Sequence, residues 1–284
     1  MLDLLEYIIL AILQGLVEWL PISSSGQVVI FSINILGISP ENAFTLSIWL
    51  HLGTTLAVLV KMRKEYFNIV KTIIFKKDRY EEKDVKLRNW LIYATLGTAV
   101  TALPLYFILR FFLLDAFSAS SGDILTLIIS GLLIITGLVL FFLKRSFGNK
   151  SIEGQSFKQI RKDSSISGLI QGIAILPGIS RSGFTVSSIL FEKYNQDQSL
   201  NLSFLMSAPV VIASLGVDVL FGEGSVFGTL DIITILVTTA ISFVIGYLTM
   251  GGLLKIARKI NFSYFCIFYG IIAFVFILPV LIIT

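Results

Sequence analysis

Six stretches of mainly apolar residues, each about as long as a membrane-spanning helix, dominate this sequence of 284 residues. They cover residues 44–61, 89–112, 123–143, 201–221, 228–254 and 262–283. An α-helix needs about 20 apolar residues to cross the ~30 Å hydrocarbon core of a bilayer. Charged residues make up only 14% of the chain, against about 25% in an average soluble domain. A soluble globular, disordered or fibrous protein is therefore excluded, and the sequence predicts a polytopic helical membrane protein.

Four further apolar stretches are too short or too interrupted to span a bilayer. They cover residues 4–19, 22–37, 166–177 and 181–192, and each pair is joined by a turn rich in Pro, Gly and Ser, PISSSGQ and PGISRSGFT. Such pairs are typical of re-entrant hairpins, which dip into the membrane and return to the same side. The predicted fold is all-α, with six transmembrane helices and two re-entrant helical hairpins made of four short helices.

The Lys and Arg residues predict the orientation. Loop 61–88 holds ten of them and loop 144–162 holds six, and this topology places twenty of the chain's 22 on one side. Arg110 marks the other side, and Arg181 lies in a hairpin turn. The positive-inside rule then puts the basic loops in the cytoplasm of a plasma-membrane protein, with both termini outside. Basic loops also explain the net charge of +4 without a nucleic-acid partner.

Two minor features limit other interpretations. Residues 64–77 have the pattern of an interfacial helix, although a solvated loop that touches anionic lipid is the favoured interpretation. The single cysteine, Cys266, excludes a disulfide framework, a Cys-ligated zinc site and an iron–sulfur cluster. The single histidine, His51, excludes multi-histidine metal centres.

The two hairpin turns resemble each other. Residues 14–26 align without a gap with residues 171–183, 157 positions later, and six of the thirteen positions are identical. The chain therefore reads as one membrane domain, 1–284, with a first repeat at 1–143 and a second at 144–284 that opens with a basic linker at 144–165. Three full spans separate the hairpins, so the second copy enters from the opposite face, as in inverted-topology repeats. Such repeats bring broken helices together near the midplane, where backbone N–H groups can hold an anion.

The first turn offers a carboxylate and hydroxyl groups. Glu18 is an acid at membrane depth, which is costly and normally functional. Gln14 lies one helical turn earlier, so these two side chains could ligate Mg²⁺ or Ca²⁺ or orient a hydroxyl group. Ser23, Ser24 and Ser25 follow, and one of them could be a nucleophile if Glu18 takes its proton, while others cap the next helix.

The second turn offers positive charge. Arg181 stands between Ser180 and Ser182, with Gly183 and Thr185 close behind. A buried Arg with neighbouring hydroxyls and glycine-enabled backbone donors is typical of a phosphate site. The Arg needs an acidic partner in space, and either Glu18 or a bound phosphate could be that partner.

These two turns carry a specific resemblance. QGLVEWLPISSSG is similar to the first signature of the undecaprenyl-diphosphatase or bacitracin-resistance family, and LPGISRSGFT is similar to the second. The likeness extends over the whole chain, including the His51–Thr54 segment HLGT. It implies a membrane enzyme that removes the terminal phosphate from a polyprenyl diphosphate at the outer face and so recycles a lipid carrier of cell-wall or glycan export. The implied fold has six full spans and four re-entrant helices.

The resemblance also implies roles for individual residues. Gln14 and Glu18 match the acidic motif, Ser24 matches the proposed nucleophile, and the matches to the phosphate-binding turn are Ser180, Arg181 and Thr185. Further candidates for substrate binding are Ser23, Gln27, His51, Ser182 and Gly183. Many family members have His where this chain has Gln27, which cannot titrate. Either that His is dispensable, or Glu18 does the proton transfer, or the activity is altered, and His51 could substitute.

Several alternatives stay open. A divalent cation at Gln14 and Glu18 could neutralise the diphosphate, and either Ser24 or a water held by Glu18 could attack the phosphorus. A polyprenyl-phosphate flippase or transporter would use the same repeat architecture, and a non-catalytic lipid-binding homologue would fit Gln27. The expected partners are the polyprenyl diphosphate and membrane lipids, and the sequence leaves a homodimer open. Asp218 lies within a predicted span without an assigned role.

Overall fold

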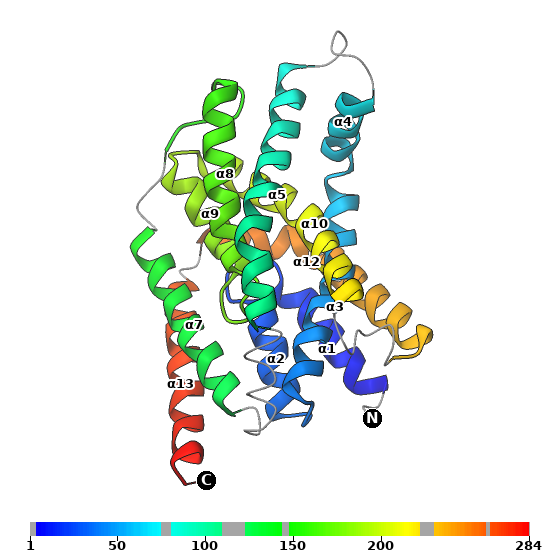
Figure 1. Cartoon of the computed structure of the whole chain (residues 1–284), viewed down its shortest axis with the longest axis vertical. Helices are drawn as coiled ribbons and strands as arrows, with labels where there is room; N and C mark the ends of the chain where they lie inside the picture. The colour runs from blue at the N-terminus through cyan, green and yellow to red at the C-terminus, as the bar shows by residue number, and fades with distance from the viewer. Residues whose placement is uncertain are drawn as a thin grey trace.

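The computed structural model describes residues 4–74, 81–109, 123–143, 148–221, 230–259 and 262–283, and the regular elements in these ranges are all helices. The predicted all-α class is therefore confirmed, whereas Arg110 lies outside the described residues. Figure 1 shows an elongated bundle in which α10 and α12 cross the long axis obliquely. The first half contains α1 (Leu4–Val17), α2 (Ser24–Asn34), α3 (Pro40–Lys61), α4 (Arg63–Ile74), α5 (Glu82–Ile108) and α7 (Asp123–Leu143). The second half contains α8 (Phe157–Ile173), α9 (Arg181–Phe191), α10 (Gln196–Phe221), α12 (Ile232–Lys259) and α13 (Phe262–Ile283).

Within the described ranges, five helices are long and apolar enough to cross a membrane. They are Pro40–Lys61, Glu82–Ile108, Asp123–Phe142, Gln196–Phe221 and Ile232–Ile256. The sixth predicted stretch forms α13, which has 22 residues, and its side chains are described only over 263–275. These helices show a polytopic membrane protein, while the exact number of spans stays a prediction.

Two segments differ from the expectation. The solvated-loop interpretation is wrong for residues 63–74, because they form α4, which buries Ile69 and Thr72 on one side and exposes Phe67 and Ile73 on the other. The remaining residues of that segment from 75 onward lie outside the described ranges. Helix α8 begins at Phe157, inside the predicted basic linker, because the Ser156 hydroxyl accepts a hydrogen bond from Gln159 N and caps the helix.

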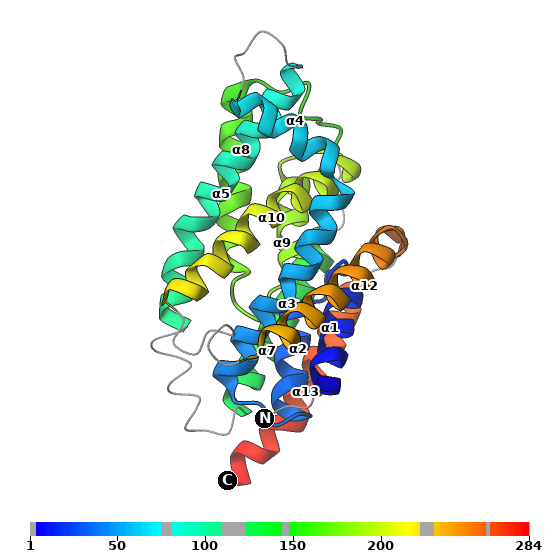
Figure 2. The ribbon, with the colours of Figure 1, turned by 90° about the vertical axis from the view of Figure 1, so that its right-hand side faces the viewer.

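The ends of the helices separate into two groups along the long axis. In Figures 1 and 2, α1 begins and α13 ends near one end of the molecule, while α4 and the start of α8 lie near the opposite end. The basic residues of α4 and of the first turns of α8 thus gather away from both chain ends.

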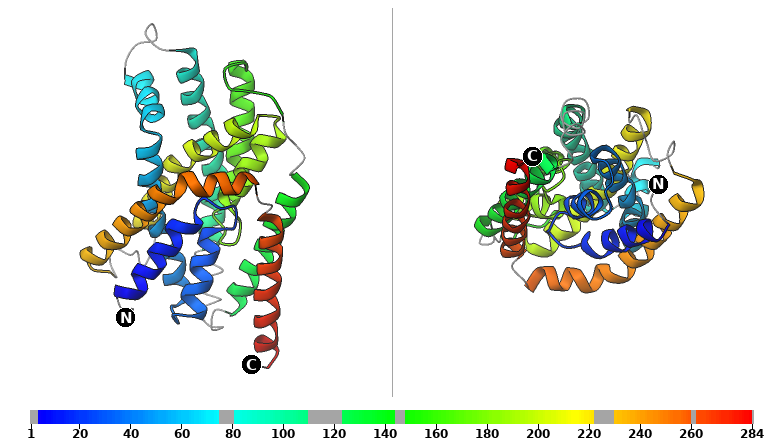
Figure 3. Two further views of the ribbon diagram at one scale, coloured as in Figure 1. Left: turned by 180° about the vertical axis from the view of Figure 1, so that it is seen from behind. Right: turned by 90° about the horizontal axis from the view of Figure 1, so that it is seen from below.

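Helices of the first half of the chain pack against helices of the second half. Helix α1 packs on α12, and α8, its counterpart in the predicted repeat, packs on α5, the predicted counterpart of α12. Figure 3 shows α12 and α1 running side by side. Helix α3 contacts its counterpart α10, and α7 contacts its counterpart α13. Helix α2 lies against α3, and α9 lies against α10 of its own half and against α7 of the first half.

Candidate active site

The turn between α1 and α2 touches the turn between α8 and α9. Ser23 has a left-handed backbone conformation (φ 60°), and its hydroxyl accepts hydrogen bonds from Gly26 N at 3.3 Å and from Gly178 N of the other turn at 3.0 Å. Gly178 has a φ of 101°, which favours glycine. A Cβ atom on Gly26 would lie only 2.9 Å from Gly178 N. Glycine at both positions therefore lets the two backbones meet.

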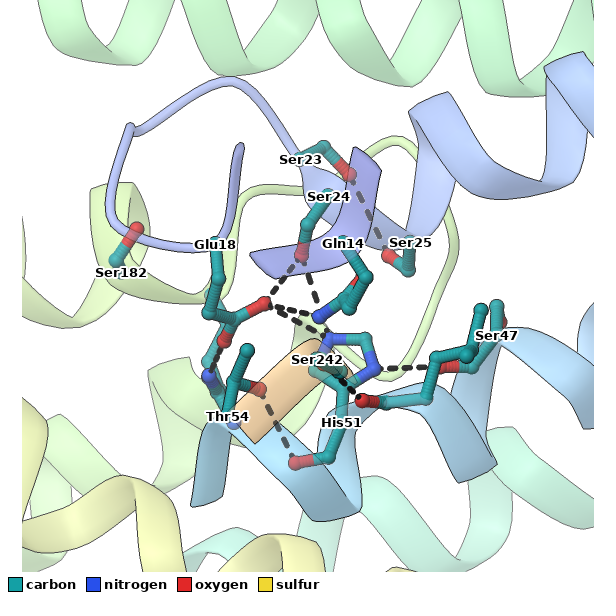
Figure 4. Close-up of polar contacts among 12 residues, drawn as sticks. Gln14, Glu18, Ser23, Ser24, Ser25, Ser47, His51, Thr54, Ser182 and Ser242 are labelled. Atoms are coloured by element: carbon teal, nitrogen blue, oxygen red, sulfur yellow. Dashed lines mark hydrogen bonds and ion pairs between the residues drawn. The ribbon is translucent and has the colours of Figure 1, made fainter. Parts of the chain in front are cut away.

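Glu18 lies at the centre of the polar cluster in Figure 4, and only 3% of its side chain is exposed. Its Oε2 accepts hydrogen bonds from Gln14 Nε2 and from Ser24 Oγ, both at 2.6 Å. Its Oε1 forms an ion pair with Arg181 Nη2 of the second turn. The buried carboxylate is thus stabilised by a cation and by neutral donors, as burial of a charge requires.

Arg181 is the first residue of α9. Ser180 precedes it as the N-cap, with its hydroxyl accepting from Gly183 N at 3.1 Å. The Arg181 side chain reaches the first turn and remains 22% exposed. Ser182 Oγ lies 3.4 Å from Ser180 Oγ. The acidic and cationic turns therefore meet in one place, although they are 163 residues apart in the sequence.

His51 joins this cluster from the middle of α3. Its Nε2 atom lies 3.2 Å from Glu18 Oε2 and 3.3 Å from Ser24 Oγ, and its Nδ1 atom contacts the backbone carbonyl of Ser47 (Figure 4). The side chain is 14% exposed. His51 is therefore part of the polar cluster rather than a histidine at the end of a span.

A cavity opens beside these side chains. Its polar wall contains Glu18, Ser23, Ser24, Ser25, Ser47, His51, Thr98, Gln171, Ser180, Arg181, Ser182 and Ser214. Its apolar wall contains Leu20, Phe44, Ile48, Ala102, Ala174, Ile175, Ile179, Val210 and Val211. The lining thus offers polar groups that suit an anionic headgroup and apolar side chains that suit a hydrocarbon segment.

Four of the candidates from the sequence do not line this cavity. Gln14 is fully buried behind Glu18, and Gln27 donates a hydrogen bond to the backbone carbonyl of Ile22 at 3.2 Å. The backbone N–H of Gly183 is taken by the Ser180 cap. Thr185 is fully buried and donates to Gln171 Oε1 at 3.2 Å.

Gln14 and Glu18 do not fit a resident divalent cation. Both Glu18 oxygens are already engaged, and the guanidinium of Arg181 would repel a second cation. The buried Oε1 of Gln14 has no hydrogen-bond partner, yet one amide oxygen falls far short of the six or so oxygen ligands that Mg²⁺ and Ca²⁺ require. Across the described residues, groups of three or more His, Cys, Asp or Glu that could hold a metal are absent. A divalent cation therefore stays a prediction.

Two residues that line the cavity were not among the candidates from the sequence. Gln171 is the repeat counterpart of Gln14, and it lines the cavity and donates to Thr98 Oγ1 at 3.1 Å. The repeat alignment contained this signal, because Gln14 and Gln171 are identical. Ser47 lies one turn before His51 on α3, and its carbonyl fixes the imidazole. A backbone contact of this kind leaves no trace in the sequence.

Comparison with known proteins decides the family. The family model described as bacitracin resistance protein BacA matches residues 7–275. The chain belongs to this family. Among its relatives within the family, a protein of Methanothrix thermoacetophila named undecaprenyl-diphosphatase is 40% identical over 95% of both chains. Proteins with the same name from Methanococcoides burtonii and Haloarcula marismortui are 38% and 35% identical, over 96% and 94% of this chain and 98% and 94% of theirs.

Proposed function

We propose that this protein is an integral membrane phosphatase that hydrolyses a polyprenyl diphosphate of the undecaprenyl type to the monophosphate and inorganic phosphate, and so recycles the lipid carrier. The observation that carries the proposal is the meeting of Glu18, Ser24 and Arg181 in the lining of one cavity that also contains apolar side chains. The names of the relatives support it. The family name agrees with a link to bacitracin resistance.

The cavity suggests how the reaction proceeds. Arg181 leaves Glu18 to pair with the diphosphate, and the hydroxyls of Ser180 and Ser182 add donors to the phosphate oxygens. Donors placed in advance around the phosphoryl group stabilise the charge of the transition state. Ser24, or a water held by Glu18, attacks the terminal phosphorus in line, and the polyprenyl monophosphate leaves. The prenyl chain lies along the apolar wall.

We further propose that the two hairpins are re-entrant and belong to an inverted repeat. Helices α2 and α9 have eleven residues each, or about 16 Å of length, which is half of a bilayer core. The reciprocal packing of α1 on α12 and of α8 on α5 supports two halves of opposite orientation. In this topology the basic ends of α4 and α8 face the cytoplasm, and the cavity opens to the outer face.

Phosphate release by the purified protein from defined polyprenyl diphosphates tests the function. We expect release by the wild type and a loss of at least a hundredfold in Ser24→Ala, Glu18→Ala and Arg181→Ala. Activity unaffected by all three substitutions would remove the site assignment. A flippase, the less favoured alternative, would release no phosphate but would move labelled lipid in liposomes.

A further inference from the structure

Helix α4 follows a membrane-spanning helix directly, and the length of that helix sets its depth. Helix α3 has 22 residues, or about 33 Å of length, which already covers the ~30 Å hydrocarbon core of a bilayer. Met62 ends α3, and α4 begins at the next residue, near the end of the molecule that lies away from both chain ends (Figures 1 and 2). If α3 spans the membrane, α4 therefore lies at the level of the lipid headgroups.

One side of α4 is fixed on the helix bundle. Ile69 and Thr72 are buried, and the Thr72 carbonyl accepts a hydrogen bond from Arg88 Nη1 of α5 at 3.0 Å. The Tyr66 hydroxyl donates to the Leu205 carbonyl of α10 at 2.9 Å. These contacts determine which side chains of α4 point away from the protein.

The outward side of α4 carries an apolar stripe. Its members are Phe67, Val70, Ile73 and Ile74, and each of them is between 46% and 67% exposed. Steps of three or four positions place these side chains on one face of the helix. Four large apolar side chains gathered on one face are unfavourable in water, whereas they suit contact with lipid acyl chains.

Basic residues accompany this stripe. Arg63, Lys64 and Lys71 give α4 three positive charges, against the one negative charge of Glu65. The Lys71 ammonium lies 4.1 Å from the centroid of the Phe67 ring, so the positive charge borders directly on the apolar stripe. Apolar side chains for acyl chains beside positive charge for headgroups are typical of a helix that lies in an anionic membrane surface.

We propose that α4 binds anionic phospholipids of the cytoplasmic leaflet. Its apolar stripe lies among the acyl chains, and Lys64 and Lys71 bind the headgroup phosphates. The excess of positive charge selects anionic over zwitterionic lipid, and the direct continuation from α3 places the stripe at the membrane surface. This inference goes beyond the proposed function and depends only on the proposed topology, so it stands or fails independently of phosphate release.

The first test places a tryptophan probe on α4 in the full chain reconstituted into lipid nanodiscs. Phe67→Trp puts the probe on the apolar stripe, and Asn68→Trp, about 100° further around the helix, serves as the matched control. The three native tryptophans are at most 6% exposed, so the wild type supplies the background emission. We expect brominated acyl chains to quench the probe of Phe67→Trp and aqueous iodide to quench that of Asn68→Trp. Val70→Trp repeats the measurement on the stripe if Phe67→Trp does not fold.

The second test measures the role of charge. Brominated phosphatidylglycerol is titrated into phosphatidylcholine nanodiscs that hold Phe67→Trp, and the quenching gives the preference for the anionic lipid. Adding Lys64→Gln and Lys71→Gln should lower this preference about 25-fold, because each basic residue near an anionic surface contributes about fivefold. Glu65→Gln, on the same helix but of opposite charge, is the matched control and should keep or increase the preference. High salt should weaken it.

Three results would overturn the proposal. Quenching of the Phe67→Trp probe by iodide would place the apolar stripe in water. A probe that neither iodide nor brominated lipid reaches would show that a second copy of the chain or another protein covers the stripe. Equal quenching by phosphatidylglycerol and phosphatidylcholine, unchanged by the two lysine substitutions, would remove the selection by charge.

Discussion

The contact between the two turns gives a prediction whose magnitude follows from the structure. A Cβ atom added at Gly26 would lie 2.9 Å from Gly178 N, 3.0 Å from Gly178 Cα and 3.1 Å from Ser23 Oγ. Ordinary carbon contacts begin at about 3.4 Å, so Gly26→Ala must push the turns apart by about 0.5 Å. The obstacle is backbone rather than the end of a flexible side chain, and overpacking of this kind costs about 1–3 kcal/mol of folding free energy.

The same displacement should reduce catalysis. Gly26 lies with Ser24 in the first turn of α2, and Gly178 lies in the turn that leads into α9 and Arg181, so the substitution separates the attacking group from the phosphate-binding group. A misplacement of about 1 Å can cost a hundredfold in rate, so we expect Gly26→Ala to lower kcat about ten- to hundredfold. Phosphate release and thermal unfolding in the same detergent measure the two effects.

Gly216→Ala provides the matched control. Gly216 lies within α10, and a Cβ atom there would meet nothing within 4 Å. Alanine should therefore leave activity unchanged and stabilise the helix by at most about 1 kcal/mol. If Gly26→Ala instead keeps the activity and the melting temperature of the wild type, the turns do not depend on their close approach, and the argument for a site shared between them fails.

Three further predictions follow from other features. Arg181→Lys keeps the charge but loses the planar fork that suits phosphate, so kcat/KM should fall about 10- to 100-fold, and an unchanged value would exclude a bidentate contact. The Tyr66 hydroxyl donates at 2.9 Å to the Leu205 carbonyl, which lacks its helical donor because Pro209 has no N–H. Tyr66→Phe should therefore lower the free energy of unfolding by about 1 kcal/mol, as measured by chemical unfolding. Lys158 is exposed, so the cysteine of Lys158→Cys should react with a membrane-impermeant thiol reagent only from the cytoplasmic side of vesicles. Labelling from the outer side would reverse the proposed orientation.

Much of the fold could be predicted because long apolar runs and broken ones have different physical consequences. A run such as 123–143 must form a helix if its backbone is to be satisfied in lipid, and it does. The pairing of Glu18 with Arg181 was one of two alternatives, since a buried charge needs a counterion or a ligand. The pattern of residues 64–77 indicated a helix, but their basic side chains favoured a solvated loop, and the structure has the helix α4.

Tertiary packing decided the rest of the site. His51 is one polar residue in a spanning helix, and it meets Ser24 only because α2 packs on α3. Thr185 looked like a phosphate ligand in the sequence, but the rotation of α9 turns its hydroxyl toward Gln171. The three consecutive serines could not be told apart in sequence, whereas the structure makes Ser23 the helix cap and directs Ser24 to Glu18.

The hydrogen bond from Gly178 N to Ser23 Oγ joins residues that are 155 positions apart. A ribosome inserting this chain into a membrane has therefore finished more than half of it before the first hairpin can acquire its partner. Until then, the carboxylate of Glu18 lacks its ion-pair partner Arg181. A truncated product that ends before the second hairpin would consequently be inert toward phosphate esters, and its Glu18 would keep only the contacts to Gln14, Ser24 and His51.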